Sequence, residues 1–492
     1  MQFRLIQILE LGENMNKKLK KYLNYGNMAV ILLLAAGILF SKVVPSTIKP
    51  WLLGLIALIE GIRFSLRFIT KKSFRSETKL VFSILILFVF FAFMFFEIRF
   101  RNLLNNINQD FDSYDVHFVS TENTINESAL ELDGQTIGLL NDADSLVSHQ
   151  LPKEIIDENE LKVDWAYYES YADMIFALND NEIDLVVLPG GYKESFGSIE
   201  GLTDIVANFH TVYSEIRTRE SEVIETNQDV LNLVLIGGDN PIQGQSTAGF
   251  NYDVIVVLSM KLESGESRML SIPRDSYIKL SCTNKNDKIT HTGWFGAKCL
   301  TDTLSNFLDI EINKYALVDF KGLIEIVDSL GGIWIDVESR IVEQDENRNF
   351  DNLITIEPGY QKLDGQQALA FLRHRKTLAG GAITRSENHE KFIVALMKQL
   401  AQPSSLLNIN GFIGGIENTV LTNLSNDDMM HYYDAGVKLI GKNGIDGILP
   451  ESLQLEGYGD SIYSESFGSN LYYYVLNEES VQQIKTSFGE IQ

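Results

Sequence analysis

The chain has 492 residues, of which 45% are hydrophobic, and this length favours two or three domains rather than a single core. Its charge is uneven: residues 1–101 carry 15 Lys and Arg against 5 Asp and Glu, whereas residues 102–492 carry 26 against 61, a net charge of −35. Because non-specific nucleic-acid binding needs a basic surface, the acidic remainder argues against that class of function.

Residues 1–101 are expected to hold a cytoplasmic N-terminus and three transmembrane helices. Apolar runs occupy residues 28–44 and 80–96, and a shorter run at 48–63 qualifies if Arg63 extends to the membrane interface. Lysines precede the first run, and six basic residues lie between residue 63 and residue 79. The positive-inside rule then places the chain after Phe96 outside the cell. The alternative, a cleaved signal peptide, fits three successive apolar runs poorly.

Residues 102–227 are predicted to form a small extracellular accessory α/β domain. Strand-like runs at 135–140, 161–168 and 184–189 alternate with helix-like stretches at 145–158 and 171–180, as in a parallel βαβ unit. Gly190 and Gly191 follow the last strand and are expected to make a turn. A charged stretch at 214–229 is predicted to be helical and to separate this domain from the next.

Residues 228–492 are predicted to form a second α/β domain, with helices packed on a central sheet. Strands are expected at 231–239, 252–260 and 268–273, followed by a helix that begins near Lys321 and ends at Gly331 and Gly332. The only two cysteines of the chain, Cys282 and Cys299, lie in this domain. Outside the membrane they are predicted to form a disulfide, and the alternative is two buried free thiols.

Arginines are scarce after residue 101, since only nine occur there, and four of them point to a local anion site: Arg274, Arg373, Arg375 and Arg385. If residues 371–376 are extended, Arg373 and Arg375 share one face, with His374 on the other, and two guanidinium groups suit a phosphate or pyrophosphate. The alternative is a solvated, salt-bridged edge.

Arg385 lies in a segment whose sequence predicts the start of a helix. Residues 384–387 match a capping box and an apolar stripe follows, which predicts Thr384 as the N-cap, Arg385 in the first turn and His389 one turn later. A cation at a helix N-terminus is unfavourable unless an anion is also held there. The alternative is an arginine that faces solvent.

Two aspartates lie at strand ends that we expect to meet at one edge of the sheet. Asp239 ends one predicted strand and Asp253 begins the next. Two carboxylates with open positions suit Mg²⁺, which completes its coordination with water and substrate phosphate. Aspartate at a strand end is also common in ordinary turns.

From residue 271 onward, a series of motifs resembles the LytR-CpsA-Psr family. In order, these are SIPRD at 271–275, DKITH at 287–291, VDFKGLIEIVDSLGGIWIDV at 318–337, PGYQKLDGQQALAFLRHRK at 358–376, the helix led by Arg385, and TNLS at 422–425. The resemblance covers roughly residue 231 to the C-terminus. The three apolar runs and the preceding α/β unit are similar to the capsule-assembly members, which carry an accessory domain there.

The resemblance implies a central mixed sheet flanked by helices, with a hydrophobic cavity for a polyprenyl chain. The implied activity is transfer of a glycopolymer phosphate, from teichoic acid or capsular polysaccharide, from a polyprenyl pyrophosphate to peptidoglycan, assisted by Mg²⁺ or Mn²⁺. Asp239 and Asp253 fall on the metal-linked positions, whereas the pyrophosphate-binding and catalytic positions hold Arg274, Arg373, Arg375 and Arg385. His389 would lie beside the substrate.

Three positions depart from the family pattern. Asn251 stands where an arginine is usual, Ala382 where an aspartate is usual, and His389 where a glutamine is usual. The absence of one guanidinium and one carboxylate is expected to affect catalytic turnover more than the binding of ligand. The alternative function is therefore a non-catalytic membrane protein that binds the lipid-linked glycopolymer or regulates its assembly.

Overall fold

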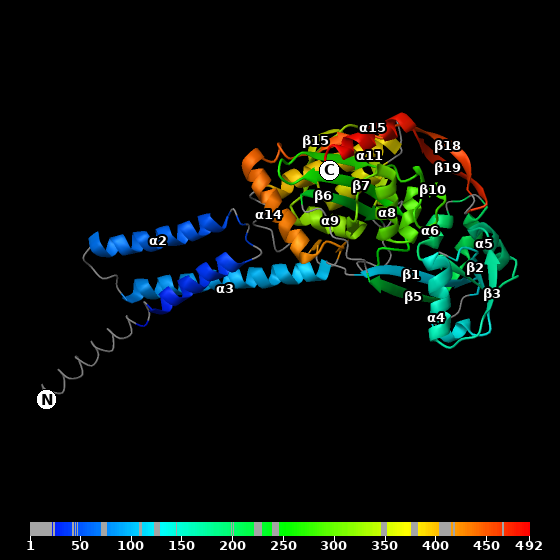
Figure 1. Cartoon of the computed structure of the whole chain (residues 1–492), viewed down its shortest axis with the longest axis horizontal. Helices are drawn as coiled ribbons and strands as arrows, with labels where there is room; N and C mark the ends of the chain where they lie inside the picture. Colours follow the sequence, from blue (N-terminus) through cyan, green and yellow to red (C-terminus); the bar gives the residue numbers. More distant parts are fainter. Residues whose placement is uncertain are drawn as a thin grey trace. The chain divides into compact units, whose positions relative to one another are not determined.

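The structure is a computed structural model of the whole chain, drawn in Figure 1. It describes residues 22, 25–41, 44, 46, 48–69, 76–107, 111–122, 128–143, 145–197, 199, 201–220, 229–238, 246–345, 352–374, 382–402, 415–416, 419–464 and 467–492. For residues 62–69, 76–83, 105–107, 111–113, 194–195, 220 and 382–384 it describes the backbone alone. Of the predicted site residues, Asp239 and Arg375 lie outside the described residues.

The chain divides into two compact units, Met1–Asn105 with Asn426–Gly441, and Asn106–Ser425 with Lys442–Gln492. The first unit is helical: residues 25–40 form a helix, and the unit holds α2 (Lys49–Ile69) and most of α3 (Ser76–Ile107) and α14 (Asn426–Asn443). The Ser46 backbone N–H and hydroxyl donate to Asp434 at 2.6 and 2.9 Å. In the part of the chain that is described, no helix combines the length and the apolar character that a bilayer crossing requires.

The second unit begins with a five-stranded sheet in the order β3-β2-β4-β1-β5. The three predicted strands form its parallel half: β2 (Thr136–Leu140), β3 (Asp164–Tyr168) and β4 (Leu185–Pro189). The longer strands β1 (Phe111–Ser120) and β5 (His210–Glu220) pair antiparallel to each other, and β1 pairs antiparallel to β4. The helical segments of this part are η1 (Ala129–Leu132), η2 (Leu146–Gln150), α4 (Leu151–Glu158), α5 (Tyr171–Asn179), α6 (Tyr192–Phe196) and α7 (Thr203–Ala207).

The prediction of a helix at 214–229 is wrong as far as Glu220, because residues 210–220 form strand β5. The charged residues of this stretch suggested an exposed helix, but Val212, Tyr213, Ile216 and Thr218 also favour a strand. The pairing partner is β1, about a hundred residues earlier, which short-range patterns do not reveal. The rest of the predicted helix, residues 221–228, lies outside the described part.

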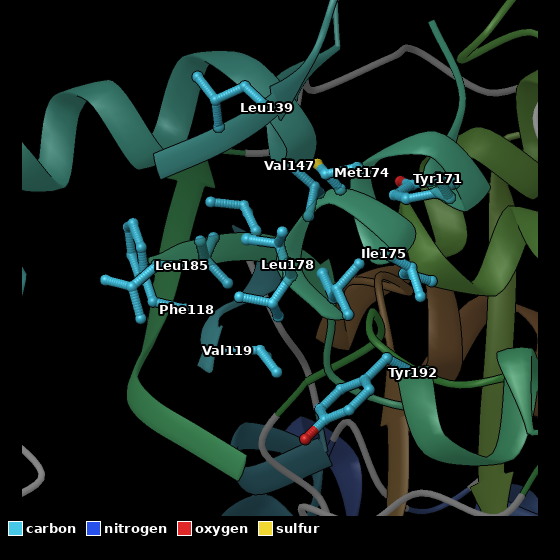
Figure 2. Packing of buried hydrophobic residues seen from close by; sticks show 14 of the residues in the cluster. Phe118, Val119, Leu139, Val147, Tyr171, Met174, Ile175, Leu178, Leu185 and Tyr192 are labelled. Atoms are coloured by element: carbon cyan, nitrogen blue, oxygen red, sulfur yellow. The ribbon is translucent and has the colours of Figure 1, made fainter. Parts of the chain in front are cut away.

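A hydrophobic core holds this sheet and its helices together. Figure 2 shows side chains of α5, including Ile175 and Leu178, packed toward Phe118 and Leu185 of the sheet. Phe118 and Ile175 are 0% exposed, and Leu178 is 1% exposed. Burial of each such side chain contributes roughly 1.5–3 kcal/mol, so this core stabilises the packing of α5 on the sheet.

The predicted central mixed sheet is confirmed, with the strand order β16-β11-β6-β7-β8-β17. Its strands are β6 (Val230–Gly238), β7 (Tyr252–Lys261), β8 (Ser267–Ser271), β11 (Lys314–Asp319), β16 (Val420–Thr422) and β17 (Glu451–Leu453). β6 runs parallel to β11 and antiparallel to β7, which is antiparallel to β8.

Helices cover both faces of this mixed sheet. One face packs against α8 (Ala297–Leu308) and α15 (Glu478–Gly489), and the other against α11 (Ala382–Leu400), which also packs on α9 (Phe320–Ser329) and α10 (Gly365–Arg373). Among the described residues, the remaining elements are η3 (Ile289–Trp294) and four two-stranded antiparallel sheets. These pair β9 (Tyr277–Lys279) with β10 (Asn286–Lys288), β12 (Ile333–Val337) with β15 (Gly359–Leu363), β13 (Ile341–Gln344) with β14 (Leu353–Ile356), and β18 (Gly457–Ser464) with β19 (Ser469–Leu476).

Two local features follow the sequence closely. Helix α9 ends where predicted, because Gly331 and Gly332 adopt φ values of +73° and +89°, which other residues rarely accept. Cys282 and Cys299, 17 residues apart, are joined by a disulfide that ties the β9–β10 turn to the first turn of α8.

Candidate functional site

A cavity of about 390 Å³ lies between the mixed sheet and helices α9, α10 and α11. Most of its lining is apolar and comes from β6, β7, β11 and these helices: Leu235, Ile236, Val254, Ala316, Val318, Phe320, Leu323, Ile326, Leu372, Phe392, Ile393 and Leu396. The charged and polar side chains of its lining are Asp253, Arg274, Glu343, Arg373, Arg385 and His389. The five described residues that were predicted to form the site are therefore brought together in one cavity.

Asp253 and Arg274 form an ion pair at this cavity. Asp253 is the second residue of β7, and Arg274 follows β8, the strand paired with β7. Burial lowers the pKa of Arg274, but the charges of Asp253 and Asp275 raise it by more, so its pKa lies above the ordinary value and the side chain stays cationic. Arg274 Nε is buried and has no hydrogen-bond partner among the described residues. A buried donor of this kind favours an added acceptor such as a phosphate oxygen.

Arg385 lies in the first turn of α11 and is 6% exposed. Its Nη2 donates to the backbone carbonyl of Asp253 at 3.3 Å, so the helix start is tied to the strand that carries the carboxylate. The prediction of Thr384 as the N-cap is wrong, because the helix begins two residues earlier, at Ala382. Alanine is the best helix former, and the helical backbone extends through it.

Arg373 is the last residue of α10, so the extended conformation that would place Arg373 and Arg375 on one face does not hold for residues 371–373. The helix begins at a capping box in which Asp364 and Gln367 bond to each other's backbone N–H groups. That signal lies nine residues upstream, outside the short segment on which the prediction rested. Arg373 Nη1 donates to the carbonyl of Asp345 at 3.1 Å, and its guanidinium lies 5.4 Å from the centre of the Phe320 ring.

His389 lies one turn after Arg385, as predicted, and is 2% exposed. Its Nε2 lies 3.3 Å from the Leu372 carbonyl, which can only accept, so this nitrogen carries the proton. When the ring is neutral, Nδ1 accepts from the Ser271 hydroxyl at 3.1 Å. The ring joins α11 to α10 and β8 while it lines the cavity.

Sequence reasoning missed two acidic residues. Glu343 of β13 lines the cavity and contacts His374 Nδ1 at 2.9 Å, but it falls in no motif and no local pattern marks it. Glu390, next to His389, is 5% exposed and accepts from the Ser271 backbone N–H at 3.0 Å. Burial raises the pKa of Glu390 to about 7. The sequence signal that could have identified Glu390 was its position on the inner, buried face of helix α11.

Glu390→Gln is expected to change how the stability of the protein depends on pH. The carboxyl group takes up its proton near pH 4.5 in the unfolded chain and near pH 7 in the folded chain, so between these values the folded state binds more protons. Wild-type stability should therefore fall as pH rises from about 4.5 to about 7, by a term on the order of 3 kcal/mol. Glutamine cannot ionise, so the stability of the variant should not show this fall with rising pH.

Thermal unfolding of both proteins at pH 5 and pH 8 measures the effect. The stability of the variant relative to wild type should be higher at pH 8 than at pH 5. Glu357→Gln, at a carboxylate that is 67% exposed and pairs with Arg340, is the control and should show little change. An equal difference between Glu390→Gln and wild type at both pH values contradicts the expectation.

Known proteins share this sequence and architecture in part. A polyisoprenyl-teichoic acid–peptidoglycan teichoic acid transferase TagU of Bacillus licheniformis is 29% identical over 290 residues, which cover 58% of this chain and 85% of the relative. The transferase of the same name from Bacillus subtilis is 27% identical over 310 residues, which cover 62% of this chain and 92% of the relative.

Two solved structures are also similar. The crystal structure of B. subtilis TagV has 22% sequence identity and a TM-score of 0.44, with 54% of this chain and 98% of that chain covered. The structure of TagT bound to LI-WTA has 22% identity and a TM-score of 0.41, with 55% and 94% covered.

The family relationship is carried by the sequence match. Residues 204–489 match the LytR_cpsA_psr family, and this range contains the mixed sheet, the helices around the cavity and every predicted site residue. The match extends over more than half of the chain. The chain therefore belongs to the LytR_cpsA_psr family.

Proposed function

We propose that this chain is a membrane-anchored phosphotransferase, which moves a glycopolymer from a polyprenyl pyrophosphate to peptidoglycan. The observation that carries the proposal is the cavity, where the guanidinium groups of Arg274, Arg373 and Arg385 meet a largely apolar lining. An apolar wall suits a polyprenyl chain, and clustered guanidinium groups suit a pyrophosphate. The relatives are named polyisoprenyl-teichoic acid–peptidoglycan teichoic acid transferases, which supports the same substrate class.

The proposed reaction is a phosphoryl displacement. A sugar hydroxyl of peptidoglycan attacks the phosphorus that carries the glycopolymer, a new P–O bond forms, and the bond to the bridging oxygen breaks. Polyprenyl monophosphate leaves with the electron pair of that bond, and the hydroxyl proton is released. Arg274, Arg373 and Arg385 would stabilise the charge that develops on the phosphate oxygens and the leaving group.

We propose that this site also holds a divalent cation, Mg²⁺ or Mn²⁺. Asp253 supplies one carboxylate at the cavity wall, and Asp239, directly after β6, is proposed as the second. Two carboxylates with substrate phosphate are a common set of ligands for Mg²⁺. When bound there, the metal would withdraw charge from the phosphate oxygens.

Release of polyprenyl monophosphate tests the activity directly. The full chain in lipid vesicles is incubated with a polyprenyl-pyrophosphate oligosaccharide, peptidoglycan fragments and Mg²⁺. We expect lipid monophosphate and glycosylated peptidoglycan to form together. If the lipid binds but no monophosphate is released, the phosphotransferase is excluded, and the chain is the non-catalytic binder that the departures at Asn251, Ala382 and His389 allow.

The proposed location is the cell membrane, with the three apolar runs of residues 28–96 as anchors and everything after Arg101 outside the cell. The support is the distribution of basic residues around these runs. Protease added to intact protoplasts should digest the region after Arg101 and leave an N-terminal fragment protected. Protection of the whole chain would contradict this topology and the proposed function with it, because peptidoglycan lies outside the membrane.

A further inference from the structure

The hydrophobic core of the α/β unit of residues 111–220 also includes side chains from outside the unit, among them Trp294 and Phe467. Trp294 of η3 is 2% exposed, and its ring centre lies 6.1 Å from that of Tyr171 and 5.5 Å from that of Phe196, both in the α/β unit. Phe467, between β18 and β19, is 0% exposed and lies 5.4 Å from Phe196 and 5.6 Å from Trp294. Figure 1 shows this hairpin, in red, running from the mixed sheet toward α5 and α6.

Trp294 also contacts the segment that leads into the cavity. Its indole Nε1 donates to Asn251 Oδ1 at 3.0 Å. Asn251 directly precedes β7, and Asp253, two residues later, pairs with Arg274 and accepts from Arg385 through its carbonyl. The side chain that stands in place of the usual family arginine is thus hydrogen-bonded to the aromatic junction.

A second contact holds the same segment from the other side. A Cβ atom at Gly191, in the turn after β4, would lie 2.5 Å from the Gly249 carbonyl oxygen and 3.1 Å from Phe250 Cα. Gly249 itself, with φ of +98°, donates to the Gly293 carbonyl at 2.9 Å. Residues 249–251 are therefore enclosed between the α/β unit and η3, and Gly191, besides its place in the turn, permits this close approach.

We propose that the α/β unit acts as a positioning element, which fixes the start of β7 through Trp294 and Asn251 and so sets the geometry of Asp253, Arg274 and Arg385. The inference rests on the proposed function, since it assigns a role toward the same anion site. In the described part of the chain, Trp294, Asn251 and Phe196 all lie outside the set of residues that lines the cavity. An effect of these residues on ligand affinity would have to pass through the segment 249–253, or through η3 itself, where the Thr290 backbone N–H donates to the Arg274 carbonyl at 3.0 Å.

The test measures binding of inorganic pyrophosphate with Mg²⁺ to the full chain in detergent micelles, by calorimetry, well below the melting temperature of each variant. Trp294→Phe keeps an aromatic ring but removes the N–H donor, and Asn251→Ala removes the acceptor. Each should weaken binding by about two- to thirty-fold, the range common for residues coupled to a site without touching its ligand. In the double variant the loss should equal that of either single variant, because both remove the same contact.

Phe196→Leu tests the part played by the α/β unit, and Phe118→Leu is its matched control. Both phenylalanines are 0% exposed, but Phe118 packs against Tyr213, away from Trp294. Phe196→Leu should weaken pyrophosphate binding, whereas Phe118→Leu should lower the melting temperature with unchanged affinity. This comparison separates positioning from a general loss of stability.

The outcomes are distinct. If wild type binds pyrophosphate, Arg385→Ala does not, and Trp294→Phe binds like wild type, the positioning role is refuted and the anion site stands. Losses that add in the double variant, or equal effects of Phe196→Leu and Phe118→Leu, also refute it. If wild type itself binds no pyrophosphate, the anion site is absent and both proposals fail.

Discussion

Arg385→Ala is expected to weaken binding of a polyprenyl-pyrophosphate sugar by about 2–5 kcal/mol, or roughly thirty- to several-thousand-fold. The guanidinium is almost fully buried and lies at the cavity wall, where it meets the carbonyl of Asp253. A pyrophosphate diester brings two negative charges into a largely apolar space, and an uncompensated charge in such surroundings is costly. Removal of one buried cationic partner therefore costs much more than removal of a surface cation.

Arg340→Ala is the matched control. The Arg340 side chain is 59% exposed and forms an ion pair with Glu357, itself 67% exposed. Surface pairs of this kind contribute about 0–1 kcal/mol to stability, so lipid binding should stay near the wild-type value. Titration of each protein with the lipid in vesicles gives the two affinities. Equal affinities for Arg385→Ala and Arg340→Ala would show that the pyrophosphate binds elsewhere.

Replacement of Cys282 and Cys299 by alanine is expected to lower the free energy of unfolding by roughly 3 kcal/mol, the chain-entropy value for a loop of this length. The disulfide closes a separation of 17 residues and fixes the β9–β10 turn to α8, a helix whose inner face packs on the mixed sheet. Without it, the unfolded chain gains conformational freedom, which favours unfolding.

Thermal or urea unfolding of the full chain, with and without reductant, measures this effect. Wild type should lose stability when reductant is added, and the double alanine variant should be insensitive to it. Labelling of the denatured protein with a thiol reagent provides an independent check, since the wild-type cysteines should react only after reduction. If wild type labels equally with and without reductant, the cysteines are free and the predicted loss does not apply.

Local signals in the sequence determined several elements by themselves. The glycine pair at 331–332 ended α9, because only glycine readily adopts the positive φ values found there. The parallel strands of the first sheet and the strands β6, β7 and β8 followed from short apolar runs. Asp364 and Gln367 form a capping box, which is a signal contained in four consecutive residues. The interpretation of Arg373 considered only residues 371–376 and therefore did not use it.

Contacts between distant residues decided the rest. Strand β5 became a strand because β1, far away in sequence, offered backbone partners from one end of it to the other. Arg274 comes from the end of β8, Arg373 from the end of α10 and Arg385 from the start of α11, and only the packing of these elements on the sheet places all three at one cavity. The sequence favoured an anion site through the scarcity of arginine in an acidic chain, but it contained no sign that Trp294 would bond to Asn251. That contact depends on two chain segments about forty residues apart that meet beside the α/β unit, and periodicity and capping report only on neighbours within a few residues.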